Sequence, residues 1–248
     1  MGQRSTPGTR SLPRYAASKA QTPEGRFFGS ALRRCVTPGR YLRLMRTLAG
    51  LTGLDECDAY VLGLWCADGY QRSSSIGLSN VDPLLIQRFG SYLSRVVGSD
   101  RLRLRIYALS EEQVDERVLA LTPKRSLCPP VKMRQPAYHV YVNSRPLLRR
   151  FLNWRTEVGL LERWLIGPYF AGRFDGDGSI GSGRVPGSRI CYTTEAEAAC
   201  DRELLRRVEI TRVGLSHYRK AAEWCLYIHA ENERAFRELL KRYSCKLS

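Results

Sequence analysis

The chain has 248 residues and a formal net charge of +16, so it is long enough for one or two domains with a hydrophobic core and basic enough to favour a polyanionic partner. Nucleic acid fits that charge better than an acidic protein or a membrane surface does. No run approaches the roughly 20 consecutive apolar residues of a membrane span, and the polar N-terminus lacks the apolar stretch of a secretion signal. We therefore expect an intracellular protein, in the cytoplasm or an organelle matrix, with no membrane partner.

The cysteines and histidines suggest neither a disulfide framework nor a zinc site. The 8 cysteines are irregularly spaced and form no Cys-x-x-Cys pair. Cys66 and Cys225 fall in an expected helix and an expected strand, which fits buried free thiols in a reducing compartment. The 3 histidines have no recognisable zinc-ligand spacing.

Residues 1–55 are predicted to form a basic N-terminal extension. Its prolines break any long helix, and they are Pro7, Pro13, Pro23 and Pro38. We expect the first half of the extension to be disordered, while apolar residues at helical spacing predict a helix over 40–51.

The first ordered element is predicted to be a helix that ends in the sequence VLGLWCADG at residues 61–69. Gly63 and Ala67 are small residues four positions apart, and Asp68 follows directly before a glycine. The same pattern returns at residues 170–178, which read FAGRFDGDG. There the corresponding residues are Gly172, Gly176 and Asp177.

After the first motif, a short hairpin is predicted over 70–79, and Asp82 followed by Pro83 is a good start for a helix that runs to Gly98. A strand over 101–106 alternates arginine with apolar residues, which places three cations on one face. Further predicted elements are a basic connection over 110–136, a strand over 138–143 and a helix over 146–158. The arginines of the alternating strand are Arg101, Arg103 and Arg105.

The second half repeats this order after its own motif helix. It has predicted strands over 179–183, 189–194 and 224–229, a helix centred on 204–208 and a last helix over 231–243. The repeat predicts an α+β fold made of two pseudo-twofold-related αββαββα repeats, each with an antiparallel sheet that packs one face on helices and exposes the other. The expected domains are the extension at 1–55, a first repeat at 56–160 and a second at 161–248.

The motifs themselves predict that the two helices pack on each other. Glycine inside a helix costs about 1 kcal/mol relative to alanine, and small residues four apart lie on one face, where they let a partner backbone come close. Packing would bring Asp68 and Asp177 together at the negative ends of two helix dipoles. A divalent cation such as Mg²⁺ resolves this repulsion, since it prefers carboxylate oxygens and works beside phosphates.

The motifs also fit two plainer interpretations. Either motif alone could be an amphipathic helix that ends in a turn, although two copies at domain-sized spacing argue against this. A calcium loop is the other alternative, because Asp175, Asp177 and Ser179 alternate as in an EF-hand. That loop requires glycine and glutamate where this chain has Ile180 and Pro186, so we reject it.

The two motifs resemble the signature of the LAGLIDADG homing endonucleases, over roughly residues 58–247 and best in the second copy. The resemblance implies two packed motif helices, sheets that form a DNA-binding saddle, and a monomeric enzyme that hydrolyses both strands of a long asymmetric DNA target. It also implies Mg²⁺ or Mn²⁺ as cofactor. The expected metal ligands are the carboxylates of Asp68 and Asp177 with the carbonyls of Ala67 and Gly176.

The resemblance further implies a lysine near the scissile phosphate after the last helix of each half. Lys246 fits that place in the second half, whereas Arg163 is the nearest basic residue in the first. Asp175, which has Cys66 as its counterpart in the first motif, is expected to be solvated or structural. The residues expected to contact DNA are Arg72, Arg101, Arg103, Arg105, Arg184, Arg189, Tyr192 and Lys220.

Two other functions remain open from the sequence. A non-cleaving nucleic-acid binder on the same scaffold, either a cofactor for splicing of intron RNA or a DNA-binding regulator, would need neither acid. An unrelated α+β enzyme whose Asp-Gly turns bind calcium for stability would have no affinity for DNA.

Overall fold

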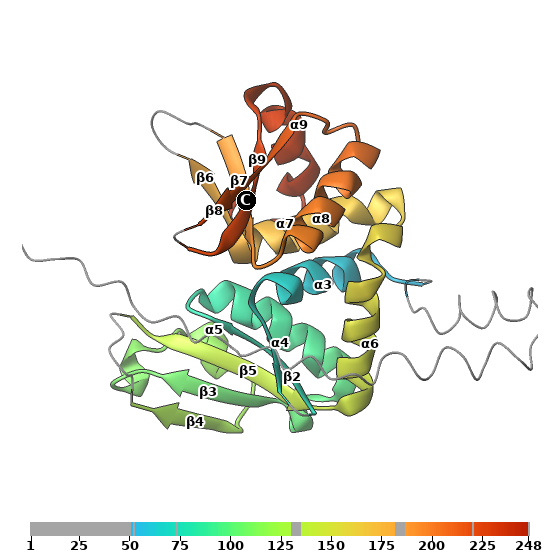
Figure 1. The fold of residues 1–248 in the computed structure, drawn as a ribbon. Coiled ribbons are helices and arrows are strands. Elements are labelled where there is room, and N and C mark those ends of the chain that lie inside the picture. Colours follow the sequence, from blue (N-terminus) through green and yellow to red (C-terminus); the bar gives the residue numbers. More distant parts are fainter. Residues whose placement is uncertain are drawn as a thin grey trace, which may run out of the picture. The chain divides into compact units, whose positions relative to one another are not determined.

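The computed structural model describes residues 51, 53–72, 74–129, 135–181, 187–219 and 221–247. Within them, helices pack against two separate β-sheets, one in each half of the sequence (Figure 1). The predicted extension up to residue 50, with most of the helix expected over 40–51, lies outside the described residues. No helix in the described part of the chain is both long and apolar enough to cross a membrane.

The first half of the fold contains a five-stranded sheet with strand order β1-β2-β5-β3-β4. Neighbouring strands are antiparallel except β3 and β4, which are parallel. The elements are α3 (Glu56–Asp68), β1 (Gly69–Arg72), β2 (Ser75–Asn80), α4 (Pro83–Val97), β3 (Arg103–Tyr107), α5 (Glu116–Leu119), β4 (Arg125–Cys128), β5 (Ala137–Asn143) and α6 (Arg145–Thr156).

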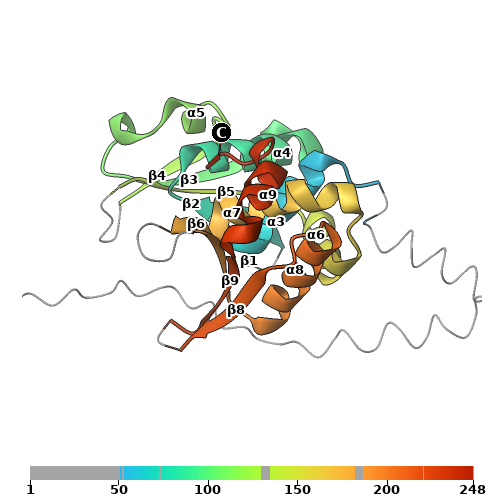
Figure 2. The same ribbon diagram turned by 90° about the horizontal axis from the view of Figure 1, so that it is seen from above.

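The second half contains a four-stranded antiparallel sheet with strand order β6-β7-β9-β8. Figure 2 shows β8 and β9 as a projecting hairpin. The elements are α7 (Ile166–Asp177), β6 (Gly178–Gly181), β7 (Gly187–Tyr192), α8 (Glu195–Arg207), β8 (Val213–Tyr218), β9 (Glu223–Ile228) and α9 (Ala230–Lys241). The second half has the predicted order of helix, two strands, helix, two strands and helix, and the first half has it with α5 and β4 inserted after β3, so the predicted α+β fold is confirmed.

Polar side chains cap the helices at the places where the sequence changes from strand or turn to helix. Asp55 and Asp58 form a capping box at the start of α3, and Asp82 accepts a hydrogen bond from Leu84 N at the start of α4, as predicted. Thr194 caps α8 in the same way. Each cap satisfies a backbone N–H that has no partner within the helix and is worth about 1 kcal/mol.

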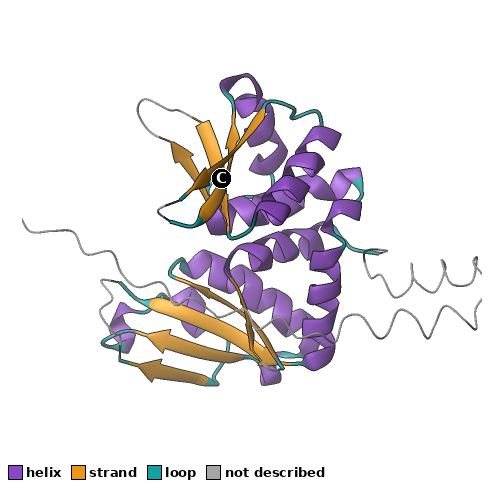
Figure 3. Cartoon of the chain, viewed as in Figure 1, coloured by secondary structure: helices purple, strands orange, loops and turns teal. Residues whose placement is uncertain are grey.

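Each sheet has one face covered by helices. In the first half α4 packs on β2 and β5, and in the second α8 and α9 pack on β7 and β9 (Figure 3). The predicted alternation in β3 is confirmed, because Leu104 and Ile106 are buried while Arg103 and Arg105 are exposed. The strand begins later than predicted, since Arg101 ends a short 3-10 helix instead.

The segment over 110–136, predicted only as a basic connection, contributes structure of its own. It contains α5 and the edge strand β4, which adds a parallel partner to β3. The four residues of β4 read RSLC and are mostly exposed. Buried and exposed residues do not alternate along β4, so the two-residue period that identifies a strand in sequence is missing, and the sequence did not predict this strand.

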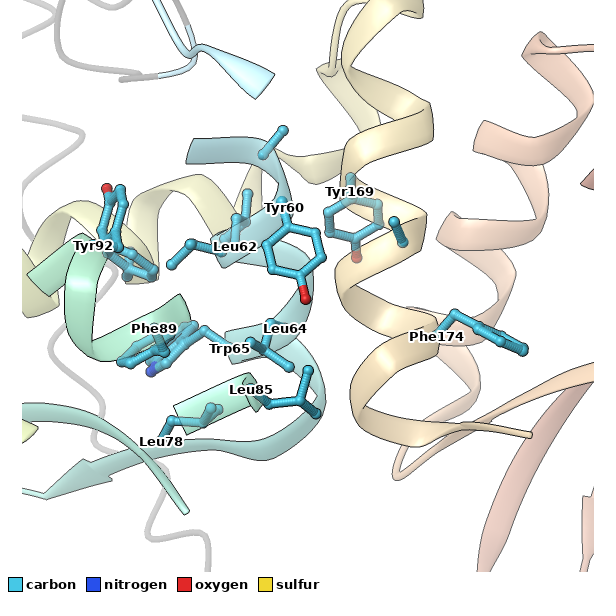
Figure 4. Close-up of a cluster of buried hydrophobic side chains, with 14 of the residues drawn as sticks. Tyr60, Leu62, Leu64, Trp65, Leu78, Leu85, Phe89, Tyr92, Tyr169 and Phe174 are labelled. Carbon is cyan, nitrogen blue, oxygen red and sulfur yellow. The ribbon is translucent and has the colours of Figure 1, made fainter. Parts of the chain in front are cut away.

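Helices α3 and α7 pack directly on each other, as the paired motifs predicted. A Cβ atom placed on Gly63 would lie 2.0 Å from the Tyr169 carbonyl oxygen, and one placed on Gly172 would lie 2.0 Å from the Tyr60 carbonyl oxygen. The contacts are reciprocal, as in an interface around a twofold axis. Figure 4 shows Tyr60 and Tyr169 at this seam, beside the apolar cluster of the first half.

Candidate metal and nucleic-acid site

The two motif acids are the last residues of the two packed helices. Asp68 ends α3 and Asp177 ends α7. The helix ends touch, because a Cβ atom placed on Gly176 would lie 2.4 Å from Ala67 Cβ and 3.2 Å from Asp68 Oδ2. Close packing at the glycines thus carries one carboxylate against the last turn of the other helix.

The pKa of Asp68 reflects the burial and the charges around the two helix ends. Burial raises it from 3.8 to about 6, and the negative charge of Asp177 adds to the rise. A hydrogen bond from Asn80 Nδ2 to Asp68 Oδ2, at 2.7 Å, opposes the rise. Lys246 and Arg173, the cations that oppose it, both come from the second half. The site therefore favours a further positive charge near Asp68.

Lys246 lies beside the acids, at the C-terminal end of α7. Its Nζ donates to the carbonyl oxygens of Gly178 at 2.8 Å, Phe174 at 3.1 Å and Gly176 at 3.4 Å. Such carbonyls carry the negative end of the helix dipole and attract cations. Burial lowers the pKa of Lys246, while Asp175, Asp68 and Asp177 oppose that change.

The oxygen atoms at the helix ends fit a hard divalent cation. Carboxylates and backbone carbonyls are the ligands that Mg²⁺ and Ca²⁺ prefer. The Gly176 carbonyl already attracts one positive charge, because it accepts a hydrogen bond from the Lys246 ammonium at 3.4 Å. In the described part of the chain, no three or more His, Cys, Asp or Glu side chains are grouped to hold a metal ion. A cation held by Asp68 and Asp177 would thus retain water or phosphate ligands, as Mg²⁺ commonly does.

The exposed face of the first sheet carries the cations predicted for DNA. Strand register places Arg103 opposite Tyr141 and Arg105 opposite His139, and the Arg105 guanidinium lies 5.5 Å from the centre of the Tyr141 ring. Tyr70 of β1 packs edge-on against His139, with ring centres 4.3 Å apart. Sequence reasoning missed these three aromatic residues, although the alternation of β5 could have placed His139 and Tyr141 on the arginine face.

The other predicted DNA contacts are spread more widely. Arg101 is exposed, and its Nη2 donates to Asn143 O at 2.8 Å. Arg72 lies at the end of β1, opposite Ser75. In the second sheet, Arg189 is exposed and its Nε donates to Ser179 Oγ at 2.7 Å. Arg184 and Lys220 lie outside the described residues.

The prediction that Tyr192 contacts DNA is wrong. Tyr192 is only 2% exposed, and its hydroxyl donates to Asp201 Oδ2 at 2.8 Å. Side chains alternate along a strand, and in β7 the exposed Arg189 is out of phase with Tyr192. Tyr192 therefore shares the helix-covered face with Ile190.

Tyr192 belongs to a buried polar cluster that the sequence did not reveal. Arg173 of α7 pairs with Asp201 of α8 at 3.3 Å, and the Tyr169 hydroxyl donates to the same carboxylate at 3.0 Å. Burial raises the pKa of Asp201, while Arg173 and the tyrosine hydroxyls oppose the rise. The Arg173 guanidinium stacks on the Tyr192 ring, 4.3 Å from its centre, so this cluster joins α7, α8 and β7.

Two further predictions concern residues near the motifs. Asp175 was expected to be solvated or structural, and at 1% exposure it is buried and hydrogen-bonded rather than solvated. Arg163 precedes α7 in a 3-10 helix and pairs with the exposed Glu209 at 2.8 Å. Since α7 has 12 residues and a helix rises about 1.5 Å per residue, Arg163 lies at the end of α7 remote from Asp177.

Comparison with known proteins identifies the fold. No family model matches the sequence, and no curated protein matches it either. A mesophilic variant of the homing endonuclease I-DmoI superimposes with a TM-score of 0.53 at 15% identity, covering 75% of this chain and 94% of that chain. I-DmoI in complex with DNA and Mn gives a TM-score of 0.52 at 14% identity and covers 75% of this chain and 96% of that one. I-DmoI in complex with DNA and Ca gives a TM-score of 0.52 at 14% identity and covers 75% of this chain and 88% of that chain.

Proposed function

We propose that this chain, which has the fold of the LAGLIDADG homing endonucleases, is a monomeric, site-specific endonuclease that hydrolyses double-stranded DNA with a divalent metal ion. Mg²⁺ or Mn²⁺ is the proposed cofactor and Asp68 and Asp177 are its proposed carboxylate ligands. The two halves differ in sequence, so the proposed target is long and asymmetric. An intracellular location is part of the same proposal.

The observation that carries the proposal is the contact between the ends of α3 and α7. Two acids from separate repeats come close enough for the charge of Asp177 to raise the pKa of Asp68. A protein that used these helices only as a scaffold would gain stability by separating those charges. Their retention beside a cation-attracting group of carbonyls supports a site for metal and phosphodiester.

The chain's own residues have distinct tasks in this reaction. The metal, when bound between the helix ends, would activate water and stabilise charge on the leaving oxygen. Asp68 and Asp177 would hold and orient that ion, and the carbonyls of Ala67 and Gly176 would complete the protein's share of ligands. The Lys246 ammonium, on the Gly178 carbonyl at 2.8 Å, is placed to attract a phosphate oxygen to the same end of α7.

The exposed sheet faces supply the proposed contacts with DNA. Arg103 and Arg105 can bind phosphates or guanine edges with two of their guanidinium nitrogens, while the partly exposed Tyr141, on which the buried His139 stacks, adds aromatic surface beside them. Contacts to phosphates position a protein on DNA and contacts to bases select the sequence. Affinity should fall steeply with salt, because each neutralised phosphate releases counterions.

Cleavage of a plasmid pool that carries random inserts tests the proposal. Purified protein with Mg²⁺ or Mn²⁺ is expected to linearise a small subset of plasmids, which sequencing of the new ends would identify. Asp177→Ala should abolish cleavage and leave binding of the selected duplex near wild type, whereas Glu112→Gln, at an exposed acid outside both motif sequences, should change neither. Full cleavage by Asp177→Ala would refute the mechanism.

The alternative is a non-cleaving nucleic-acid binder on the same scaffold, including a splicing cofactor for intron RNA. It is favoured by the missing lysine of the first half, where Arg163 instead pairs with Glu209 at the remote end of α7. The plasmid experiment separates the two functions. Retention of nucleic acid in gel-shift assays without cleavage under any metal would support the binder, and no affinity for duplex DNA or RNA would reject both.

A further inference from the structure

We propose that Asp175 is a positioning residue that clamps the C-terminal segment 244–246 against α7 and so places the Lys246 ammonium at the end of the motif helix. The consequence for DNA cleavage rests on the proposed function, whereas the clamp itself does not. Asp175 does not contact the Lys246 ammonium. It acts through the backbone that carries the lysine.

The carboxylate of Asp175 accepts hydrogen bonds from four donors, two on each oxygen. Oδ1 accepts from Ser244 Oγ at 2.5 Å and from Lys246 N at 3.1 Å. Oδ2 accepts from Cys245 N and from Tyr60 Oη, both at 2.7 Å. A buried carboxylate is stable only when its lone pairs are used in this way, and three of the four donors come from one short segment.

The segment 244–246 depends on these bonds because it follows the end of α9 and belongs to no helix or strand. The N–H groups of two successive residues, Cys245 and Lys246, both point to the Asp175 carboxylate. Two successive backbone N–H groups that converge on one anion form a small binding concavity. Asp175 therefore fixes the direction in which the Lys246 side chain leaves the backbone.

From this anchored backbone, the Lys246 side chain runs to the carbonyls of Phe174 and Gly178, on either side of Asp175 in sequence. The backbone and the ammonium of Lys246 are thus both held at the junction of the last turn of α7 with β6. Just before the clamp, Arg88 Nη1 of α4 donates to Tyr243 O at 2.6 Å.

The motif helix does not need an acid at this position in order to fold. Cys66 stands at the corresponding place in α3, two residues before Asp68, and α3 has the same glycine contacts and the same terminal acid as α7. Tyr60 and Tyr169 also correspond, yet only Tyr60 donates to Asp175 across the seam. The clamp is therefore an addition to the second half, the half that supplies the lysine.

The test compares Asp175→Asn with Lys246→Met, which removes the ammonium and leaves the backbone clamp intact. Asp175→Asn replaces one accepting oxygen with an amide that donates, so the two donors on that oxygen lose their acceptor, and one of them is a backbone N–H of the segment in either orientation of the amide. NMR hydrogen exchange should accelerate at least about tenfold in Asp175→Asn at whichever of the Cys245 and Lys246 amides loses its acceptor, and should stay unchanged at both in Lys246→Met. Unchanged protection in Asp175→Asn would overturn the clamp, whether or not the protein cleaves DNA.

Cleavage kinetics test the positioning role on the selected duplex. Asp175→Asn should lower kcat by about 10- to 100-fold with little change in KM, since a small displacement of a reacting group has effects of that size. In the Lys246→Met background the same substitution should have no further effect. An equal loss in both backgrounds would show that Asp175 acts independently of Lys246 and would overturn the proposal.

Two milder variants keep the test decisive if Asp175→Asn does not fold. Tyr60→Phe and Ser244→Ala each remove one donor and leave the carboxylate in place. Both should accelerate exchange at the Cys245 amide by a smaller factor than Asp175→Asn would. The Lys246 amide is not used for Ser244→Ala, because Ser244 Oγ itself accepts from Lys246 N at 3.2 Å. Wild-type exchange in both variants would contradict the clamp.

Discussion

The two motif helices share one backbone arrangement and differ in what surrounds it. Counting back from the terminal acids, Tyr60 corresponds to Tyr169, Gly63 to Gly172 and Ala67 to Gly176. These matched residues make the seam. Two uncharged residues of α3 have charged counterparts in α7, because Leu64 and Cys66 correspond to Arg173 and Asp175.

The divergence extends to the helices that cover the sheets. Phe89 of α4 and Asp201 of α8 lie the same distance after their caps, Asp82 and Thr194. The first half buries Leu64 and Phe89 where the second half buries the ion pair of Arg173 and Asp201. The comparison teaches that the seam and the acids are common to both repeats, whereas the polar core and the lysine clamp belong to one.

Removing one partner of the buried ion pair should have the largest effect on stability. Asp201→Ala leaves the Arg173 guanidinium without its acid among buried side chains, which should lower the free energy of unfolding by about 3–5 kcal/mol. Urea denaturation measures this loss. The double variant Arg173→Met with Asp201→Ala should recover part of it, as the first half folds with apolar residues at both places. A loss below about 1 kcal/mol for Asp201→Ala would show that the ion pair contributes little to the stability of the second half.

The seam glycines should be similarly intolerant of substitution in the two halves. Gly63→Ala and Gly172→Ala each place a Cβ atom 2.0 Å from a carbonyl oxygen of the other helix, and each should cost about 3 kcal/mol in unfolding free energy. Thermal or urea unfolding checks the equality. A marked difference between the two would contradict a reciprocal seam.

A matched control exists outside the seam. A Cβ atom placed on Gly159 would lie 3.4 Å from Cys200 Sγ, which is close to ordinary van der Waals contact. Gly159→Ala should therefore change the unfolding free energy by less than about 1 kcal/mol.

The raised pKa of Asp68 predicts a smaller, pH-dependent effect. Its pKa in the folded protein is about 6 against an ordinary 3.8, so its contribution to stability is fully present below about pH 4 and is lost as pH rises through 6. Without divalent metal, the protein should lose about 2 kcal/mol of unfolding free energy from this group between pH 4 and pH 7. Asp68→Asn should remove this component from the measured pH profile, and an unaltered profile in that variant would contradict the assignment.

Much of the fold followed from local patterns. The glycine spacing predicted the seam of α3 and α7, the alternation of arginine with apolar residues predicted the exposed face of β3, and Asp82 predicted the start of α4. These predictions succeed because each pattern lies within one helix or one strand. Backbone geometry there fixes the side-chain period at about 3.6 residues in a helix and 2 in a strand.

The features that the sequence did not predict depend on contacts between distant residues. Nothing local pairs Arg173 with Asp201, because an arginine inside a helix is more often exposed than buried. The bonds from segment 244–246 to Asp175 join the end of the chain to a helix far earlier in sequence. Tyr192 was misassigned because an aromatic residue suits DNA and a core equally, and only the phase of β7 decides between them.

Mn²⁺ binding tests most directly whether the seam gathers Asp68 and Asp177 around a shared cation. Titration followed by electron paramagnetic resonance would compare the wild type with Asp68→Asn, Asp177→Asn and the exposed control Glu112→Gln. The tightest Mn²⁺ site should be present in the wild type and the control and weakened at least tenfold in both single variants. Binding of wild-type affinity in either Asp68→Asn or Asp177→Asn would contradict a site that both acids share.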